Sequence, residues 1–170
     1  MTQENELRHL VHGAYEAELP GGIGTVRFDV VCPANAELVL DRVKTVLKSV
    51  IMPLTGEWPS FDDWRQMLPE WFIVSCAPEV SQIEAQERIA RWQKLSWEDK
   101  AKIDREKKWS LSNWLSWMVP DQRPWFWWDE EINDPGRIRL AIEVPDWPFP
   151  WRALRWLFIA AGATDVKAEE

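Results

Sequence analysis

The residue types that most often carry catalysis or bind metals are scarce in this chain. The two histidines, His9 and His12, stand three residues apart. On a helix this spacing places two imidazoles on neighbouring positions, whereas on a strand it sends them to opposite faces. The surrounding residues predict a strand, and no third ligand stands out, so we expect no metal site.

Nucleophiles are equally poorly supported by their neighbours. Ser75 and Cys76 lie at the expected end of a helix with no histidine nearby, so we interpret Cys76 as a buried thiol. Cys32 also has apolar neighbours, and the two cysteines lack metal-type spacing, which predicts reduced core thiols. Residues 21–24, Gly-Gly-Ile-Gly, lack the Lys-Ser/Thr of a phosphate loop and precede a strand, so they indicate a turn.

Paired carboxylates are the remaining candidates for acid–base chemistry. Asp62 and Asp63 are adjacent, and Asp129 to Glu131 form a run, but a chain with 28 acidic residues contains such pairs by composition alone. We therefore predict no catalytic residue and no cofactor, and we expect that the chain is not an enzyme. A hydrolase with an unrecognised carboxylate site remains an alternative.

One run of aromatic and acidic residues is a candidate binding surface. Residues 125–128 read Trp-Phe-Trp-Trp, and in a strand Phe126 and Trp128 point to one face and the other two rings to the opposite face. If only one face packs on the core, two large rings lie open beside carboxylates and approach the ~300–600 Å² patch that usually indicates interaction. If helices cover both faces, all four rings belong to the core, and the sequence leaves both possibilities open. The predicted partner-binding residues are Phe126, Trp128, Asp129, Glu130, Glu131 and Asp134.

Charge and composition narrow the partner. The net charge of −8 and the pI near 4.9 disfavour nucleic acid and anionic membranes and favour a basic partner. The basic stretch of residues 100–108 is interleaved with Asp and Glu and predicts a salt-laced helix surface. Fourteen tryptophans against one tyrosine predict core packing first. No apolar stretch is long enough to cross a bilayer and no signal peptide is evident, so we expect a cytoplasmic protein.

The pattern of the chain predicts an α+β fold. Alternation over residues 10–19 and 25–30 predicts an N-terminal hairpin, and Asn35 opens a helix of about sixteen residues. Ser60, Ser81 and Ser96 each precede an acidic residue at capping-box spacing in a helical middle, in which Pro69 splits a helix. The predicted C-terminal elements are a second hairpin, strands at 125–128 and 138–144, and a final helix from Pro150 to Gly162.

We expect these elements to form a single domain that spans residues 1–170. The two hairpins form one antiparallel sheet, and the C-terminal helix packs on one face. Residues 1–6 and 164–170 are predicted to be flexible ends.

The C-terminal half carries a family resemblance. The segments 109–117 (Trp-Ser-Leu-Ser-Asn-Trp-Leu-Ser-Trp), 123–129 (Arg-Pro-Trp-Phe-Trp-Trp-Asp), 147–158 and 160–163 resemble small bacterial immunity proteins of polymorphic toxin systems, of the contact-dependent inhibition or type VI kind. The resemblance covers roughly residues 58–163 and contains no catalytic motif. It implies a small cytoplasmic protein that neutralises a toxin domain by binding it, and it carries no binding residues over to this chain.

The sequence therefore predicts an immunity-type inhibitor. Its acidic, aromatic-flanked surface would bind a cognate protein toxin, a basic nuclease domain being one such toxin. Two alternatives stay open: a carbohydrate or small-ligand module that uses Trp platforms, and the hydrolase named above. The oligomeric state is left undetermined.

Overall fold

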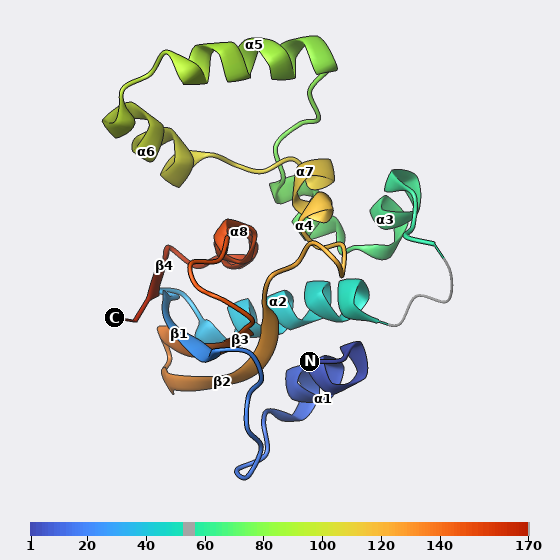
Figure 1. Cartoon of the computed structure of the whole chain (residues 1–170), viewed down its shortest axis with the longest axis vertical. Helices are drawn as coiled ribbons and strands as arrows, with labels where there is room; N and C mark the ends of the chain where they lie inside the picture. Colours follow the sequence, from blue (N-terminus) through green and yellow to red (C-terminus); the bar gives the residue numbers. More distant parts are fainter. Residues whose placement is uncertain (53–56, 170) are drawn as a thin grey trace.

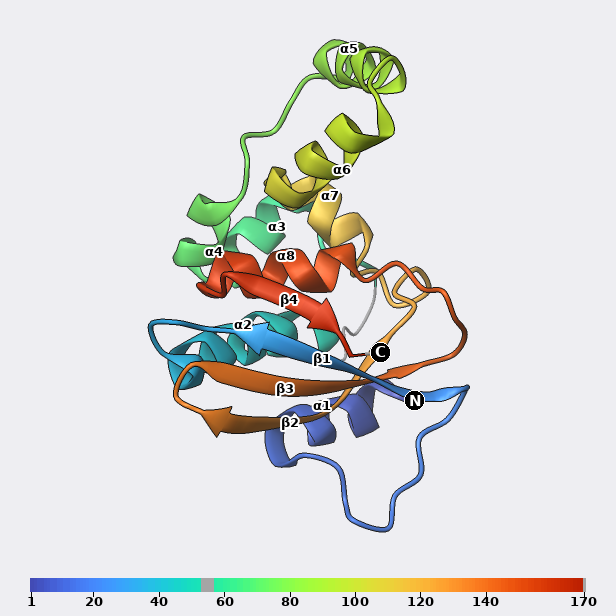
Figure 2. The ribbon, with the colours of Figure 1, turned by 90° about the vertical axis from the view of Figure 1, so that its left-hand side faces the viewer.

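The chain folds around a four-stranded antiparallel sheet. The computed structural model describes residues 1–52 and 57–169. The strands are β1 (Gly24–Val31), β2 (Phe126–Asp134), β3 (Arg137–Val144) and β4 (Asp165–Ala168), in the order β2-β3-β1-β4 (Figures 1 and 2). The predicted α+β class is confirmed, and β2 and β3 form the predicted C-terminal hairpin.

Two helices cover one face of the sheet. Helix α2 (Ala36–Ile51) begins at Asn35, whose side chain accepts a hydrogen bond from the amide of Leu38, as the sequence predicted. Helix α8 (Arg152–Ala161) ends at Gly162, which takes the left-handed conformation with φ of 119°. The apolar faces of α2 and α8 and the inward residues of the strands form the core, which includes Phe28, Val43, Leu47, Leu140, Leu157 and Phe158. The opposite side of the sheet is called the open face below.

The predicted N-terminal hairpin is wrong in its first strand. Residues 3–12 form helix α1 (Gln3–His12), capped by the Thr2 side chain, and a long loop leads from it to β1. The residues that α1 buries are Glu6, His9 and Leu10. Two of these three are polar, and the only apolar residues that α1 packs on the core are Leu10 and the partly buried Leu7, too few to predict a helix. The two histidines therefore lie on a helix, but only His9 is buried and His12 faces solvent.

The helical middle of the chain was predicted correctly in outline. It consists of α3 (Phe61–Met67), α4 (Glu70–Ser75), α5 (Gln82–Gln93), α6 (Trp97–Glu106) and α7 (Leu111–Ser116). Ser60 and Ser81 form reciprocal capping boxes, and Ser96 caps α6 through the amide of Asp99. Pro69 separates α3 from α4, as its position predicted.

The ends predicted to be flexible contain regular structure. Residues 3–6 form the first part of α1, and β4 pairs with β1 from Phe28↔Ala168 to Val31↔Asp165. The turn predicted at residues 21–24 is present, with Gly22 at φ of 57° against the end of β3. Within the described part of the chain no helix is both long enough and apolar enough to cross a membrane.

Candidate binding surface

A β-bulge decides where the predicted aromatic residues lie. Trp127 pairs with Ile142 and Asp129 pairs with Ala141, so Trp128 is an extra residue between them. Trp128 is only 9% exposed, so of the two possibilities that the sequence left open, its ring is covered and does not lie open as the predicted binding surface requires. The rings of Trp125, Trp127 and Trp128 are all buried, as in the second possibility that the sequence left open. Phe126 is half-buried, with the guanidinium of Arg123 5.5 Å from its ring centroid.

Helix α1 covers this part of the edge strand through a buried ion pair. The carboxylate of Glu6 is fully buried and accepts hydrogen bonds from both terminal nitrogens of Arg123, with Nη1 at 2.8 Å. It also accepts the backbone N–H of Trp127 at 2.8 Å. An edge strand normally presents unpaired backbone groups that invite another strand. Glu6 satisfies one of them from the side of the sheet.

His9 completes the cover over Trp128. Its ring lies 4.5 Å from the Trp128 ring centroid, and Nδ1 donates to the Trp128 carbonyl at 2.8 Å, because a carbonyl can only accept. Nε2 lies 2.9 Å from Arg8 Nη2 and 3.0 Å from Glu18 Oε1. Hydrogen bonds from Arg8 first and His9 second lower the pKa of Glu18 to about 2. These histidine contacts are structural, and no metal-binding cluster of His, Cys, Asp or Glu exists among the described residues.

The predicted carboxylates do not form one acidic patch. Glu130 turns to the helical side, where it pairs with Lys44 of α2 and accepts the Trp127 indole N–H at 2.7 Å. Burial raises the pKa of Glu130, and Lys44 opposes that rise. Asp134 accepts the amide of Gly136 at 2.8 Å within the β2–β3 turn. Only Asp129 and Glu131 stand on the open face.

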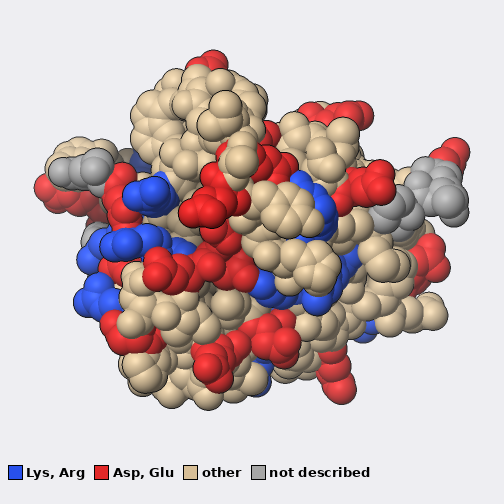
Figure 3. All heavy atoms as spheres, turned by 90° about the horizontal axis from the view of Figure 1, so that it is seen from below, with Lys and Arg blue, Asp and Glu red and all other residues tan. Residues whose placement is uncertain are grey.

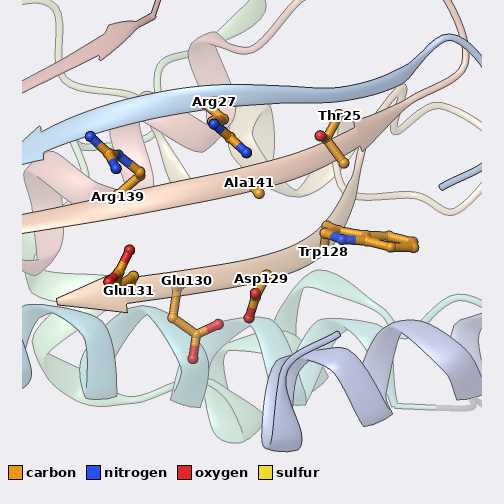
Figure 4. A pocket seen from close by; sticks show the side chains of 8 residues that line it. All are labelled: Thr25, Arg27, Trp128, Asp129, Glu130, Glu131, Arg139 and Ala141. Carbon is orange, nitrogen blue, oxygen red and sulfur yellow. The ribbon is translucent and has the colours of Figure 1, made fainter. Parts of the chain in front are cut away.

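A shallow hollow on the open face lies beside Asp129 and Glu131. In register across the strands, Ala141 stands between Arg27 and Asp129, and Arg139 stands between Asp29 and Glu131. The small Ala141 lies in a depression of about 230 Å³, whose lining includes Arg27, Asp129, Glu131 and Arg139 (Figure 4). Figure 4 also shows Glu130 directed away from it.

The hollow has the character of a charged surface. Its volume is below the range of about 300–1,000 Å³ that is typical of ligand pockets. Acidic and basic side chains are interleaved on the surface around α1 and β2 (Figure 3). Arg139 is paired with Glu169 at 3.1 Å, whereas Arg27 has no carboxylate partner among residues 1–52 and 57–169. Burial raises the pKa of the Cys32 and Cys76 thiols to about 11, so both are protonated at neutral pH. The arrangement can bind polar groups of a partner surface, and it places no activated nucleophile there.

The feature that the sequence prediction missed is a helical arm. Residues 81–108, called the arm below, contain α5 and α6 and project from the end of the molecule opposite α1 (Figures 1 and 2). Helix α5 buries none of its residues. Ile83, Ile89 and Trp97 are 70%, 58% and 77% exposed. Apolar residues such as Ile83 and Ile89 usually face a core, but no described segment covers those of α5, and the sequence alone carries no signal of this.

The arm also differs from the rest of the chain in charge. It contains eight Lys and Arg against six Asp and Glu, a net charge of +2. The other residues contain twelve and 22, a net charge of −10. The arm is therefore a weakly basic, partly apolar projection on an acidic body.

Comparison with known proteins adds no family to these observations. No protein-family model, no curated protein and no solved structure matches the chain.

Proposed function

We propose that this chain is an immunity-type protein that binds and neutralises a cognate bacterial toxin domain in the cytoplasm. The observation that carries the proposal is helix α5, which is folded and capped and yet buries none of its residues. Isolated helices of this length are marginal in water, and most helical stability in proteins comes from packing an apolar face. A partner that covers the arm would supply that packing.

Covering the exposed apolar side chains of the arm would contribute a considerable binding free energy. Fully burying a large aliphatic or aromatic side chain from full exposure contributes about 1.5–3 kcal/mol. Because Ile83, Ile89 and Trp97 are 70%, 58% and 77% exposed, together they offer roughly 3–6 kcal/mol. Association itself costs about 4–15 kcal/mol in lost freedom. The arm alone is therefore a marginal binding site, and a tight complex requires a second contact from the body.

The acidic body supplies that second contact in the proposal. Its net charge of −10 favours encounter with a basic toxin and speeds association. Asp129 and Glu131 on the open face, and Asp134 at its end, are the carboxylates placed to meet such a partner. The apolar arm then slows dissociation, because desolvated hydrophobic anchors dominate the release rate.

The test is rescue of bacterial growth from the toxin encoded beside this gene. We expect the wild type to rescue growth and the double variant Ile83→Ser, Ile89→Ser to rescue it poorly while remaining folded. Leu19→Ser is the matched control, since Leu19 is an exposed apolar residue outside the arm. Failure of the wild type to rescue overturns the function. Full rescue by the double variant keeps the function open but removes the arm from the interface.

A further inference from the structure

An aromatic hollow lies at the foot of the arm, apart from the surface described above. It measures about 360 Å³ and is lined by the rings of Trp109, Trp117, Phe149 and Trp151. This volume falls within the range of small-molecule sites, and aromatic side chains are their commonest lining. Trp109 follows the arm, Trp117 follows α7, and the other two rings precede or begin α8.

The core holds two rings of this hollow, those of Phe149 and Trp151, in place. The Phe149 ring is buried and meets Phe28 of β1 edge-on at 6.4 Å, and the Trp151 ring lies 5.1 Å from the same Phe28 ring. The Trp109 carbonyl accepts the Ala77 amide at 2.9 Å, which fixes the chain where the arm returns. Rings that are fixed before a ligand arrives lose little freedom on binding.

The polar groups around the hollow are donors. None of the indole N–H groups of Trp109, Trp117 and Trp151 donates to a described residue. The side-chain NH₂ group of Asn113, which also lines the hollow, has no described acceptor either. The Lys107 ammonium has no carboxylate partner in the described part of the chain. Arg152 is a second cation in the lining.

The charge of the hollow is opposite to that of the molecule. No Asp or Glu is among the described residues that line it, although the chain carries 28 acidic against 20 basic residues. Donors and cations around apolar rings suit an anion, because hydrogen bonds from an ammonium to a carboxylate are charge-assisted. The rings suit a flat apolar group, which stacks against aromatic faces.

We propose that this hollow binds an aromatic carboxylate, with its ring among Trp109, Trp117 and Trp151 and its carboxylate toward Lys107. The same chemistry is found in a free aromatic acid and in the C-terminal residue of a peptide that ends in Phe. A neutral sugar also stacks on tryptophan, but it makes no use of the cations.

The test follows the indole N–H signals of the ¹⁵N-labelled chain during titration with 3-phenylpropionate. We expect the signals of Trp109, Trp117 and Trp151 to move together at millimolar concentrations, while that of Trp97 stays in place. The uncharged 3-phenylpropanamide should bind more weakly, and 3-phenylpropylamine should not bind. Trp117→Ala should abolish the shifts, whereas Trp97→Ala, which removes another exposed ring, should leave them unchanged.

Charge is tested separately from ring stacking. Lys107→Gln should weaken 3-phenylpropionate about two- to five-fold, as expected for an exposed charge pair, and Lys108→Gln outside the hollow should not. Gly-Gly-Phe with a free carboxylate distinguishes the sources: tighter binding than 3-phenylpropionate indicates a peptide terminus, and weaker binding indicates a free acid. The proposal is overturned if the amine or cellobiose binds as tightly as the anion, or if none of the three indole signals moves at a ligand concentration of about 20 mM.

Discussion

Replacing Glu6 by Gln probes the ion pair that fastens α1 to β2. The Glu6 carboxylate accepts two hydrogen bonds from Arg123 and one from the Trp127 amide, and it is fully buried. Gln keeps the shape and one accepting oxygen, but its NH₂ group faces an Arg123 donor and the guanidinium charge stays buried without a counterion. Breaking one partner of a buried pair costs about 3–5 kcal/mol.

The assay is urea unfolding at pH 7. A loss of this size is a large share of the about 5–15 kcal/mol that stabilises an ordinary domain. It corresponds to a fall in Tm of roughly 6–20 °C for a chain of this length. Glu4→Gln on the exposed side of the same helix is the control and should change the free energy of unfolding by less than about 0.5 kcal/mol.

A second substitution tests whether the cost of Glu6→Gln comes from leaving the Arg123 charge buried without a counterion. In Glu6→Gln, Arg123→Met the buried cation is gone, Met fills the space beside Trp125, and the Gln oxygen still accepts the Trp127 amide. We expect the double variant to be more stable than Glu6→Gln alone. The reasoning is refuted if Glu6→Gln costs less than about 1 kcal/mol, or if removing the arginine recovers nothing.

Three further predictions concern the loop after α1 and the arm. Gly22→Ala should lower the free energy of unfolding by roughly 1–3 kcal/mol, because φ is 57° and the added Cβ would clash with the Val144 carbonyl oxygen. Gly21→Ala should have a small effect, and equal urea midpoints for the two variants would contradict this reasoning. The pKa of Glu18 is lowered to about 2 in the folded state, so the stability that Glu18 contributes is present above about pH 4.5 and is lost as pH falls toward 2. The difference in urea midpoint between wild type and Glu18→Gln should therefore shrink over that window, and a constant difference would disprove the linkage. Amides of α5 should exchange with deuterium far faster than those of α2, because α5 buries no residue; equal protection by mass spectrometry would show a packed arm.

Local signals in the sequence were sufficient for most helices and for the C-terminal hairpin. The apolar stripe of α2 with Asn35 before it, and the serine caps of α3, α5 and α6, act within a few residues and are visible in the chain itself. The alternation along β3 likewise follows from one buried and one solvated face.

The candidate site was harder to predict because it depends on distant partners. The burial of Trp128 follows from a single extra residue in β2 and from His9, more than a hundred residues away. Helix α1 packs through Glu6 and His9, and the only apolar residues that join them at the core, Leu7 and Leu10, are too few to predict a helix. The arm was missed for the opposite reason: α5 has apolar residues at helical spacing, and sequence reasoning assumes that such residues find a core.

The way the arm is joined to the body makes it a replaceable part of the protein. The chain leaves at Ala77 and returns at Ser110, which form a parallel bridge, and Glu79 accepts the Ser112 amide at 3.0 Å just beyond it. The two ends of the insertion are therefore neighbours in space, and lengthening such a closed loop changes its entropic cost only slowly. Insertions, deletions and substitutions in the arm can therefore leave the sheet and its core unchanged. If the arm binds a partner, as proposed, its binding properties can therefore change independently of the folding of the sheet.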